Sequence, residues 1–263
     1  MTAPDEATWQ PGPARPLAGW DAIDVWRADL DVEPVLIDHL RGSLSPDERA
    51  RADRFRFPRD ADRFVAGRGI LRDILGRYVA VAPAALAFRY GPQGKPELET
   101  PAGPGVGFNV SHAGGVLLVA VGLRRSIGID VERDRPGLDL ELAARYFSPG
   151  ELAVLRGLPD ARRRRAFLDC WTRKEAYIKA RGQGLSLPLD SFDVSLGPDE
   201  PARLLADRVD PGAVAGWSLR ALPMPAGYAA ALAAQGLGWR LRLWEWPGRP
   251  DAADRGVGAD AIG

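Results

Sequence analysis

The chain has 263 residues, of which 46% are apolar, so it can form one large domain or two small ones around a sizeable core. Its formal net charge is zero, which argues against nucleic acid or an acidic membrane as the partner. A single cysteine, Cys170, excludes an internal disulfide framework, and two histidines are too few for a histidine-rich metal site. Any metal is therefore expected to be a hard cation held by carboxylates.

The sequence contains no apolar run of about 18 residues, and its start lacks a basic flank followed by an apolar stretch. We therefore expect no membrane span and no secretory signal. The single cysteine fits a reducing compartment, so we expect a cytoplasmic protein.

Strand-like and helix-like patterns alternate between a Pro- and Ala-rich flexible arm, residues 1–18, and a Gly-, Asp- and Pro-rich flexible tail, residues 246–263. The patterns predict helices that open at Ser45-Pro46, at Pro58 and at Ser148-Pro149, and a further helix over residues 162–181. The expected strands are residues 23–26, 106–111, 116–122, 127–132, 192–196, 217–222, 228–234 and 239–244.

Two short sequences recur at nearly the same separation. IDVWRAD at residues 23–29 is similar to IDVERDR at residues 129–135, and LSPDE at 44–48 is similar to FSPGE at 147–151, with offsets of 106 and 103 residues. Chance similarity between short helix starts is the alternative to duplication. We favour duplication and predict an α+β fold, a pseudo-dimer of two similar α/β halves over residues 19–124 and 125–245, with the active site at the seam.

The chemistry of the two expected halves differs. Trp26 stands where the second half has Glu132, and Arg72 stands where it has Glu175. Only the second half therefore keeps the carboxylates that a cation would need. A shared site at the seam would combine basic residues of the first half with acids of the second.

Lysine is rare in this chain, where 32 of the 35 basic residues are arginine. Two of the three lysines, Lys174 and Lys179, lie in WTRKEAYIK at residues 171–179, and the third, Lys95, lies in the turn GPQGKP. Because lysine is a compact, mobile charge that arginine does not replace, we expect a site role for Lys179. Cys170 and Trp171 are interpreted as core residues.

Four of these polar residues are spaced so that they can converge. Asp130 and Glu132 share one face of a probable strand, and Glu175 and Lys179 share one face of a probable helix. Three converging carboxylates would suit Mg²⁺, which takes oxygen ligands and completes its shell with water and substrate phosphate. The alternatives are an exposed edge strand and a surface ion pair of roughly 0.3–0.5 kcal/mol.

Two further segments allow two interpretations each. NVSHAGG at residues 109–115 is either a backbone anion nest, to which Ser111 and His112 would contribute, or a simple hairpin turn, which we favour for the segment by itself. Four consecutive arginines at residues 162–165 are either a solvated helix face or a docking patch for an acidic partner.

The motifs together resemble the larger, Sfp-type branch of the 4'-phosphopantetheinyl transferases. The resemblance rests on GIDVER at residues 128–133, WTRKEAYIKARGQGLSLPLDSF at 171–192, FNVSHAGG at 108–115 and GKP at 94–96, and it spans roughly residues 20–235. This family is built as a pseudo-dimer of two α/β halves. Its members cleave the pyrophosphate of coenzyme A and move the phosphopantetheine arm to a serine of a carrier protein, releasing adenosine 3',5'-bisphosphate.

The resemblance implies roles for the converging residues. Asp130, Glu132 and Glu175 match the magnesium-binding acids of the family. Glu175 also matches the candidate general base, acting directly or through water. Lys179 matches the lysine near the coenzyme A phosphates and is expected to be catalytic.

The resemblance also implies contacts with coenzyme A. Lys95, Ser111 and His112 match residues that bind it, with Asp130 and Lys179 nearby, and Arg68 matches an arginine that some members use near the 3'-phosphate.

One early helix departs from the family pattern. Glu48 stands at a position where a lysine can occur, although Arg51 remains basic.

The predicted function is therefore a Mg²⁺-dependent 4'-phosphopantetheinyl transferase that converts apo acyl or peptidyl carrier proteins of fatty acid, polyketide or nonribosomal peptide synthesis to the holo form. Its partners would be coenzyme A and the carrier protein, with no nucleic acid and no membrane, and a monomer would suffice. The alternative from the same acids is a Mg²⁺-dependent hydrolase of coenzyme A or a nucleotide. A non-catalytic carrier-protein binder would have no need for three aligned carboxylates.

Overall fold

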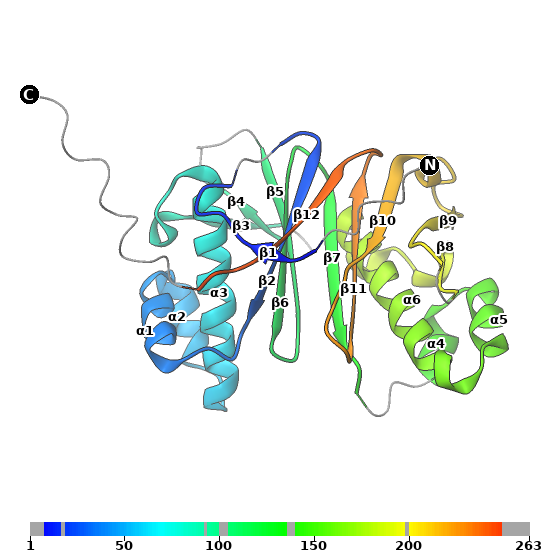
Figure 1. The fold of residues 1–263 in the computed structure, drawn as a ribbon, viewed down its shortest axis with the longest axis horizontal. Coiled ribbons are helices and arrows are strands. Elements are labelled where there is room, and N and C mark those ends of the chain that lie inside the picture. The colour runs from blue at the N-terminus through cyan, green and yellow to red at the C-terminus, as the bar shows by residue number, and fades with distance from the viewer. Residues whose placement is uncertain are drawn as a thin grey trace, which may run out of the picture.

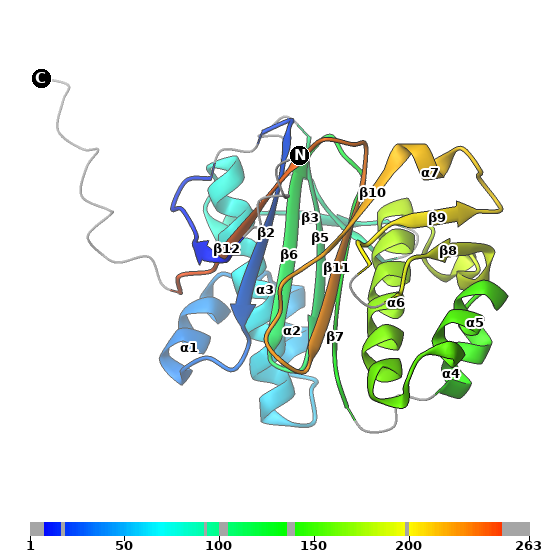
Figure 2. The same cartoon turned by 45° about the vertical axis from the view of Figure 1, so that its right-hand side comes forward.

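The computed structural model describes residues 8–16, 19–91, 94–99, 105–135, 140–197 and 200–248. Over these residues the chain forms two α+β halves that lie side by side, with strands in the centre and helices on both flanks (Figures 1 and 2). The predicted fold class is therefore confirmed. No helix in the described part of the chain is long and apolar enough to span a membrane.

The N-terminal half carries one long helix against its sheet. Its helices are α1 (Pro34–Gly42), α2 (Pro46–Ala52), α3 (Pro58–Val79) and the 3₁₀ turn η1 (Pro83–Ala85). Its strands are β2 (Ala22–Asp29), β3 (Phe88–Tyr90), β4 (Pro96–Leu98), β5 (Val106–Ala113) and β6 (Val116–Leu123). Proline in the first turn opens α1, α2 and α3, because its missing N–H is not needed there.

The C-terminal half repeats this order of strand, helices and strands. Its helices are α4 (Leu140–Tyr146), α5 (Pro149–Gly157), α6 (Asp160–Arg181), α7 (Ala213–Gly216) and the 3₁₀ turns η2 (Gly184–Ser186) and η3 (Leu189–Ser191). Its strands are β7 (Ile127–Arg133), β8 (Phe192–Val194), β9 (Leu204–Asp207), β10 (Trp217–Ala221), β11 (Tyr228–Gln235) and β12 (Arg240–Glu245).

The strands form two main sheets, one for each half. The first has the order β1-β12-β2-β6-β5, where β1 is Gln10–Pro11, and the second has the order β10-β11-β7. The pairs β2–β6 and β5–β6 are antiparallel, as are the corresponding pairs β7–β11 and β10–β11. The pairs β3–β4 and β8–β9 form separate two-stranded sheets. A buried apolar layer that includes Ile23, Leu118, Ile129 and Leu232 joins the two main sheets.

The C-terminal strand differs from the prediction. β12 was expected in the C-terminal half, but it pairs in parallel with β2 in the sheet of the N-terminal half. The buried Asp24 carboxylate accounts for this position, since it accepts hydrogen bonds from Arg242 Nη2 at 2.9 Å and from Trp244 Nε1 at 3.0 Å. A partner so remote in sequence cannot be read from local patterns.

The first residues also differ from the flexible arm that was expected. Gln10 and Pro11 pair with β12, and the indole N–H of Trp9 donates to the Pro223 carbonyl at 2.6 Å. At the other end, Trp246 donates to Asp73 at 2.7 Å, so the described part of the expected tail packs against α3. The rest of the tail, residues 249–263, lies outside the described residues.

The predicted long helices and central strands are present, and several short elements were missed. The missed elements are α1, α4, α7, β1, β3, β4, β9 and the 3₁₀ turns η1, η2 and η3. Most of them are short, so their hydrophobic periodicity is too brief to be recognised.

The same capping arrangement opens one helix in each half. Ser45 and Glu48 form a capping box at α2, and Ser148 and Glu151 form one at α5, 103 residues later. The long helices α3 and α6 have 22 residues each. Equivalent caps before helices of equal length support the predicted duplication.

Each capping-box glutamate is buried and neutralised by the long helix of its half. Glu48 pairs with Arg68 and, at 2.7 Å, with Arg72, whereas Glu151 pairs with the fully buried Lys174 at 2.8 Å. Lys174 therefore holds the core of the C-terminal half together and does not reach the site expected at the seam.

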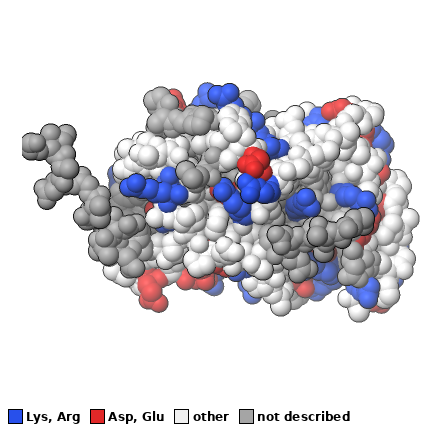
Figure 3. All heavy atoms as spheres, turned by 45° about the horizontal axis from the view of Figure 1, so that its top comes forward, with Lys and Arg blue, Asp and Glu red and all other residues white. Residues whose placement is uncertain are grey.

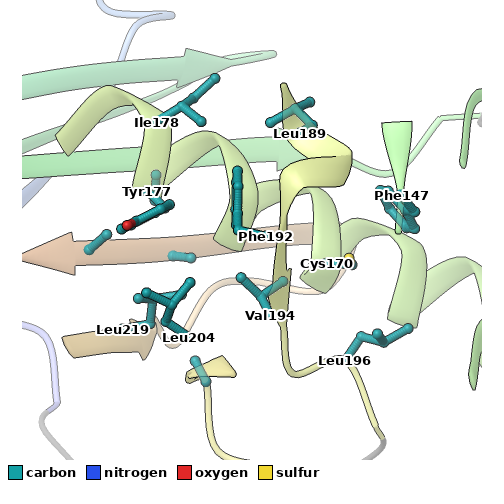
Figure 4. Close-up of a cluster of buried hydrophobic side chains, with 14 of the residues drawn as sticks. Phe147, Cys170, Tyr177, Ile178, Leu189, Phe192, Val194, Leu196, Leu204 and Leu219 are labelled. Carbon is teal, nitrogen blue, oxygen red and sulfur yellow. The ribbon is translucent and has the colours of Figure 1, made fainter. Parts of the chain in front are cut away.

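Cys170 lies in the core of the C-terminal half, as predicted. Figure 4 shows it with other labelled apolar side chains of α6 and the following segment, among them Tyr177 and Phe192, whose ring centroids lie 4.9 Å apart. Burial raises the pKa of the Cys170 thiol well above its ordinary value. A thiol in this state is packed and unreactive.

Charged side chains are interspersed on the face drawn in Figure 3, where Lys and Arg form separate groups between uncharged surface and scattered Asp and Glu.

Three of the four consecutive arginines at residues 162–165 form ion pairs. Arg163 pairs with Asp160 at 2.6 Å, Arg164 pairs with Asp134, and Arg165 pairs with Asp169 at 3.0 Å, which fits the solvated-face interpretation for these three.

Candidate active site at the seam of the two halves

Three side chains of α6 form one partly exposed stripe. Trp171, Glu175 and Lys179 follow each other at four-residue intervals, and each is half-buried while most of its neighbours are buried. The helix ends soon afterwards, where Gly182 adopts the left-handed conformation with φ 69°. The stripe thus faces a cavity near the C-terminal end of α6.

β7 supplies two carboxylates beside this stripe. Asp130 and Glu132 alternate with Ile129 and Val131, which point into the layer between the two sheets. Asp130 is 4% exposed, while Glu132 is half-buried. The strand can approach α6 closely because Gly128 carries no side chain on this face. A Cβ there would lie 2.0 Å from the Ala176 carbonyl oxygen.

Replacing Gly128 with alanine is expected to lower the free energy of unfolding by about 3 kcal/mol, because the added methyl group meets helix backbone that cannot move aside. Urea unfolding measures the loss. Gly157→Ala is the matched control, since a Cβ at Gly157 meets no atom within 4 Å. Equal stability of the two variants would contradict the close contact of β7 with α6.

β5 holds β7 in place through side chains instead of a backbone ladder. Asn109 Oδ1 accepts a hydrogen bond from Ile129 N at 2.8 Å, and Ser111 Oγ accepts one from Val131 N at 3.3 Å. Ser111 also donates to Asp130 Oδ1 at 3.0 Å. Residues two apart on one strand thus satisfy alternate N–H groups along the edge of the other, which fixes the seam.

The NVSHAGG segment is a hairpin. Asn109 to Ala113 belong to β5, which pairs with β6, and the turn between the strands falls at Gly114 with φ 58°. The hairpin interpretation is therefore confirmed, and its glycines serve the turn.

Lys179 bridges the two halves. Its Nζ donates to Asp130 Oδ1 at 2.6 Å, to Ser111 Oγ at 3.2 Å and to the Ile129 carbonyl at 3.3 Å. It has no ion pair with Glu175 within the described residues, so the surface-pair interpretation is wrong. A compact ammonium among three acceptors suits lysine better than the wider arginine fork.

These side chains line one cavity of about 390 Å³. Its walls are Val110, Ser111, His112, Asp130, Val131, Glu132, Trp171, Glu175 and Lys179. Six of the eight residues that the sequence singled out for the site therefore meet in one place.

The carboxylates of this cavity repel one another. Burial raises the pKa of Glu175 above its ordinary value, and the Asp130 and Glu132 charges add to the rise while Lys179 opposes it. Burial and the Asp130 charge also raise the pKa of Glu132, against a lowering hydrogen bond from the Trp171 side chain. Burial raises the pKa of Asp130, opposed by Lys179. Excess negative charge in this cavity favours a bound cation.

No group of three His, Cys, Asp or Glu side chains among the described residues is arranged to hold a metal ion. One feature nevertheless fits a hard cation, because Asp130 Oδ2 is buried without any hydrogen-bond partner. Oxygen donors beside such an unpaired atom match the ligands that Mg²⁺ takes.

A second cavity, of about 650 Å³, adjoins the first and shares Val110 and His112 with it. Three arginines of the N-terminal half, Arg51, Arg63 and Arg68, line it, together with apolar side chains such as Phe64. Basic first-half residues and acidic second-half residues thus meet at the seam, as the sequence predicted.

His112 lies where the two cavities meet. Burial is the main cause that lowers the pKa of its imidazole, and the positive charges of Lys179 and Arg63 lower it further. The lowered pKa favours the neutral imidazole, which can either donate or accept a hydrogen bond.

Arg68 lies in the second cavity as its predicted role requires. Its Nε donates to Glu48 at 2.6 Å and its Nη2 to Tyr90 Oη at 3.0 Å. Glu48, where the family pattern allows a lysine, is 4% exposed and serves its own helix cap and the arginines of α3. The departure at Glu48 therefore leaves the basic lining of the cavity in place.

Lys95 lies apart from both cavity linings. Its Nζ donates to the Ile127 carbonyl at 3.2 Å and to the Lys179 carbonyl at 3.1 Å. It thus ties the β3–β4 hairpin to the end of α6, which carries the stripe described above.

Sequence reasoning missed three residues of this region. Trp171 packs against the core as expected, with its ring stacked on Phe167 at 5.9 Å, but it also lines the acidic cavity because it shares the stripe of Glu175. Arg63 lies one turn from Asp60 and from Gly67 on α3, which also line the second cavity, and this helical spacing was an available signal. Asn109 gave no local signal, because its partner is on a remote strand.

Comparison with known proteins assigns this chain to one class of enzyme. A profile of the 4'-phosphopantetheinyl transferase superfamily matches residues 126–233, and one described as "4'-phosphopantetheinyl transferase, N-terminal" matches residues 36–123. Together they cover both halves. The class is that of group-transferring enzymes built from two similar halves.

Individual relatives agree. The 4'-phosphopantetheinyl transferase HetI of Nostoc sp. is 42% identical over 241 residues, which cover 91% of this chain and 98% of the relative. The 4'-phosphopantetheinyl transferase psf-1 of Bacillus pumilus is 36% identical over 70% of this chain and 77% of its own. Sfp of Bacillus subtilis is 34% identical over 64% of this chain and 79% of its own. The chain belongs to the 4'-phosphopantetheinyl transferase superfamily, and the predicted enzyme class is confirmed.

Proposed function

We propose that the enzyme takes the 4'-phosphopantetheine arm from coenzyme A and transfers it to a serine hydroxyl of an acyl or peptidyl carrier protein, with Mg²⁺ as the cofactor. The observation that carries this proposal is the pair of adjoining cavities. One has acids and Lys179, and the other has arginines and apolar side chains. Coenzyme A, whose pyrophosphate links a nucleotide to the acyl-carrying arm, has a part that suits each of the two cavities.

The larger cavity suits the nucleotide end of coenzyme A. Arg51 and Arg68 can bind phosphate oxygens, for which the planar guanidinium is well shaped. Phe55 and Phe64 offer apolar surface for the base. With the nucleotide here, the pyrophosphate would lie toward His112 and Lys179, where the two cavities meet.

The transfer requires an acceptor for the serine proton and a positive charge near the leaving group. Glu175, whose raised pKa makes it a better proton acceptor than an ordinary carboxylate, would take the serine proton directly or through water. The serine oxygen then bonds to the phosphorus that carries the pantetheine arm. The phosphorus–oxygen bond to adenosine 3',5'-bisphosphate breaks, and Lys179 balances the charge on that leaving group.

Asp130, Glu132 and Glu175 are the residues that would hold Mg²⁺, since they supply oxygen donors and one unpaired buried atom. Mg²⁺ neutralises pyrophosphate charge when bound. Lys179 donates a hydrogen bond to Asp130 Oδ1, which leaves Asp130 Oδ2 available as a metal ligand.

We expect Mg²⁺ to raise the melting temperature of the wild-type enzyme mixed with adenosine 3',5'-bisphosphate, because a ligand that binds only the folded state stabilises it. Asp130→Asn should lose this shift. Gly157→Ala, away from the cavity, should keep it. Thermal unfolding in Mg²⁺ and in EDTA gives the answer, and an undiminished shift in Asp130→Asn would refute the ligand assignment.

Lys179→Arg is expected to lower the transfer rate at least about tenfold, because the guanidinium cannot occupy the position of an ammonium with three acceptors within 3.3 Å. Arg156→Lys, on the exposed end of α5, controls for a general effect of exchanging basic residues. Steady-state kinetics compares the two. Wild-type turnover in Lys179→Arg would show that only its charge matters.

A hydrolase of coenzyme A or of a nucleotide would use the same acids, but membership in the transferase superfamily favours transfer. We also propose that a monomer suffices, because both cavity walls come from one chain. The single buried thiol of Cys170 fits a cytoplasmic enzyme.

A further inference from the structure

A third cavity lies on the other side of α6. It measures about 470 Å³ and is lined by Ala161, Arg162, Arg165, Ala166, Asp169, Arg173, Leu196, Gly197, Glu200 and Ala221. At 3.6 residues per turn, positions 162, 165, 169 and 173 share one side of the helix. The stripe of Trp171, Glu175 and Lys179 is centred roughly 125° away around the axis, and the two cavities share no lining residue, so this cavity is separate from the active-site cavity.

Arg173 forms the inner wall of this cavity. The residue is 5% exposed, and its Nη1 donates to the carbonyl and hydroxyl oxygens of Ser195. Among the described residues it has no ion pair, and its Nε and Nη2 donate to no protein atom. Burial lowers the pKa of Arg173, opposed first by the Asp169 charge. A buried cation without a partner is costly unless an anion joins it.

The rim adds a second free cation. Arg162 is exposed and forms no ion pair within the described part of the chain. The carboxylates nearby are occupied with other groups: Asp169 pairs with Arg165 at 3.0 Å, and Glu200 accepts from Gly197 N at 3.1 Å. Among the described residues that line the cavity, three arginines face two carboxylates, so this part of the lining is positive.

We propose that this cavity is a binding site for a phosphate-type oxyanion, bound by Arg173 from within and by Arg162 at the rim. A guanidinium presents parallel N–H groups that match two oxygens of a phosphate. The cavity exceeds the size of a bare phosphate, so the phosphate can be free or part of a small ester. Arg162 and Arg173 lie on the same side of α6, 11 residues and about three turns apart, and an oxyanion held between them therefore braces the helix whose other side carries Glu175 and Lys179.

Amide hydrogen exchange with added inorganic phosphate tests the site, with chloride at equal ionic strength as the reference. We expect phosphate to slow exchange in peptides covering residues 160–173 and 194–197, and half-maximal protection to require at least about tenfold more phosphate in Arg162→Ala. Arg156→Ala, an exposed arginine outside the cavity, should behave as the wild type. Arg162 is exposed and unpaired, so its removal should leave folding intact.

The location of the protection decides the outcome. Protection confined to β5, β7 and α3 would mean that phosphate binds only the groove, and equal protection by chloride would mean a general ionic effect; either result overturns the proposal. Glycerol 3-phosphate is titrated beside inorganic phosphate to distinguish an ester from the free ion. Arg173→Gln provides a second check, because it should abolish protection at 194–197 while retaining phosphopantetheine transfer.

Discussion

Replacing Glu175 with glutamine is expected to lower the rate of phosphopantetheine transfer by about 10²–10⁴, the usual contribution of a positioned general base. Glutamine keeps the size of the side chain, but it cannot accept the serine proton and is a weaker ligand for a cation. The half-buried position of Glu175 beside Asp130 and Glu132 means that the substitution also removes like-charge repulsion.

The stability of Glu175→Gln distinguishes loss of chemistry from loss of fold. Because burial and neighbouring carboxylates raise the pKa of Glu175, its ionised form costs stability near pH 7, and the neutral amide should unfold at an equal or higher temperature. Calorimetry and single-turnover transfer assays measure the two properties on the same preparation. A rate within about threefold of the wild type would remove Glu175 from the role of base.

Replacing Lys174 with methionine is expected to have the largest effect on stability, a loss of roughly 3–5 kcal/mol in the free energy of unfolding. Lys174 is fully buried, and its Nζ lies 2.8 Å from Glu151 Oε2 and 2.7 Å from the carbonyls of Leu189 and Phe192. Removing the ammonium leaves a buried carboxylate without its counter-charge and two carbonyls without a donor.

The double variant Lys174→Met with Glu151→Gln is the control for this prediction. It should recover part of the loss, because no uncompensated charge stays buried, although Glu151 still accepts from Val194 N at 2.8 Å in the wild type. Urea unfolding of both variants provides the comparison. A loss below about 1 kcal/mol in the single variant would mean that Glu151 is solvated or protonated without Lys174. The refolded single variant should keep its transfer chemistry, in contrast to Lys179→Arg.

The two lysines of one motif illustrate what the sequence can and cannot tell. Their rarity indicates that an ammonium is needed at both positions, but helical spacing separates their roles. Lys179 shares the stripe of Glu175, whereas Lys174 lies on a different side, where it meets the capping-box Glu151. The capping box itself is visible in the sequence, but the partner of its glutamate is not, since that contact depends on how two helices pack.

The spacing of Asp130 with Glu132, and of Glu175 with Lys179, predicts which faces they share because strand and helix periods are local properties. Whether these four side chains converge depends on how the two halves pack at the seam. That packing rests on contacts between residues remote in sequence. Asn109 and Ser111 bond to the edge of β7. The position of β12 beside β2 depends on Asp24, more than 200 residues earlier, and no local pattern reveals it.

Intact-mass analysis of an apo carrier protein incubated with this enzyme, coenzyme A and Mg²⁺ shows whether the phosphopantetheine arm is transferred. We expect the carrier to gain the mass of one phosphopantetheine arm, adenosine 3',5'-bisphosphate to appear in equal amount, and EDTA or Glu175→Gln to suppress both. Breakdown of coenzyme A without any gain of mass, on several carriers and with folded enzyme, would contradict the proposed transfer and would favour hydrolysis.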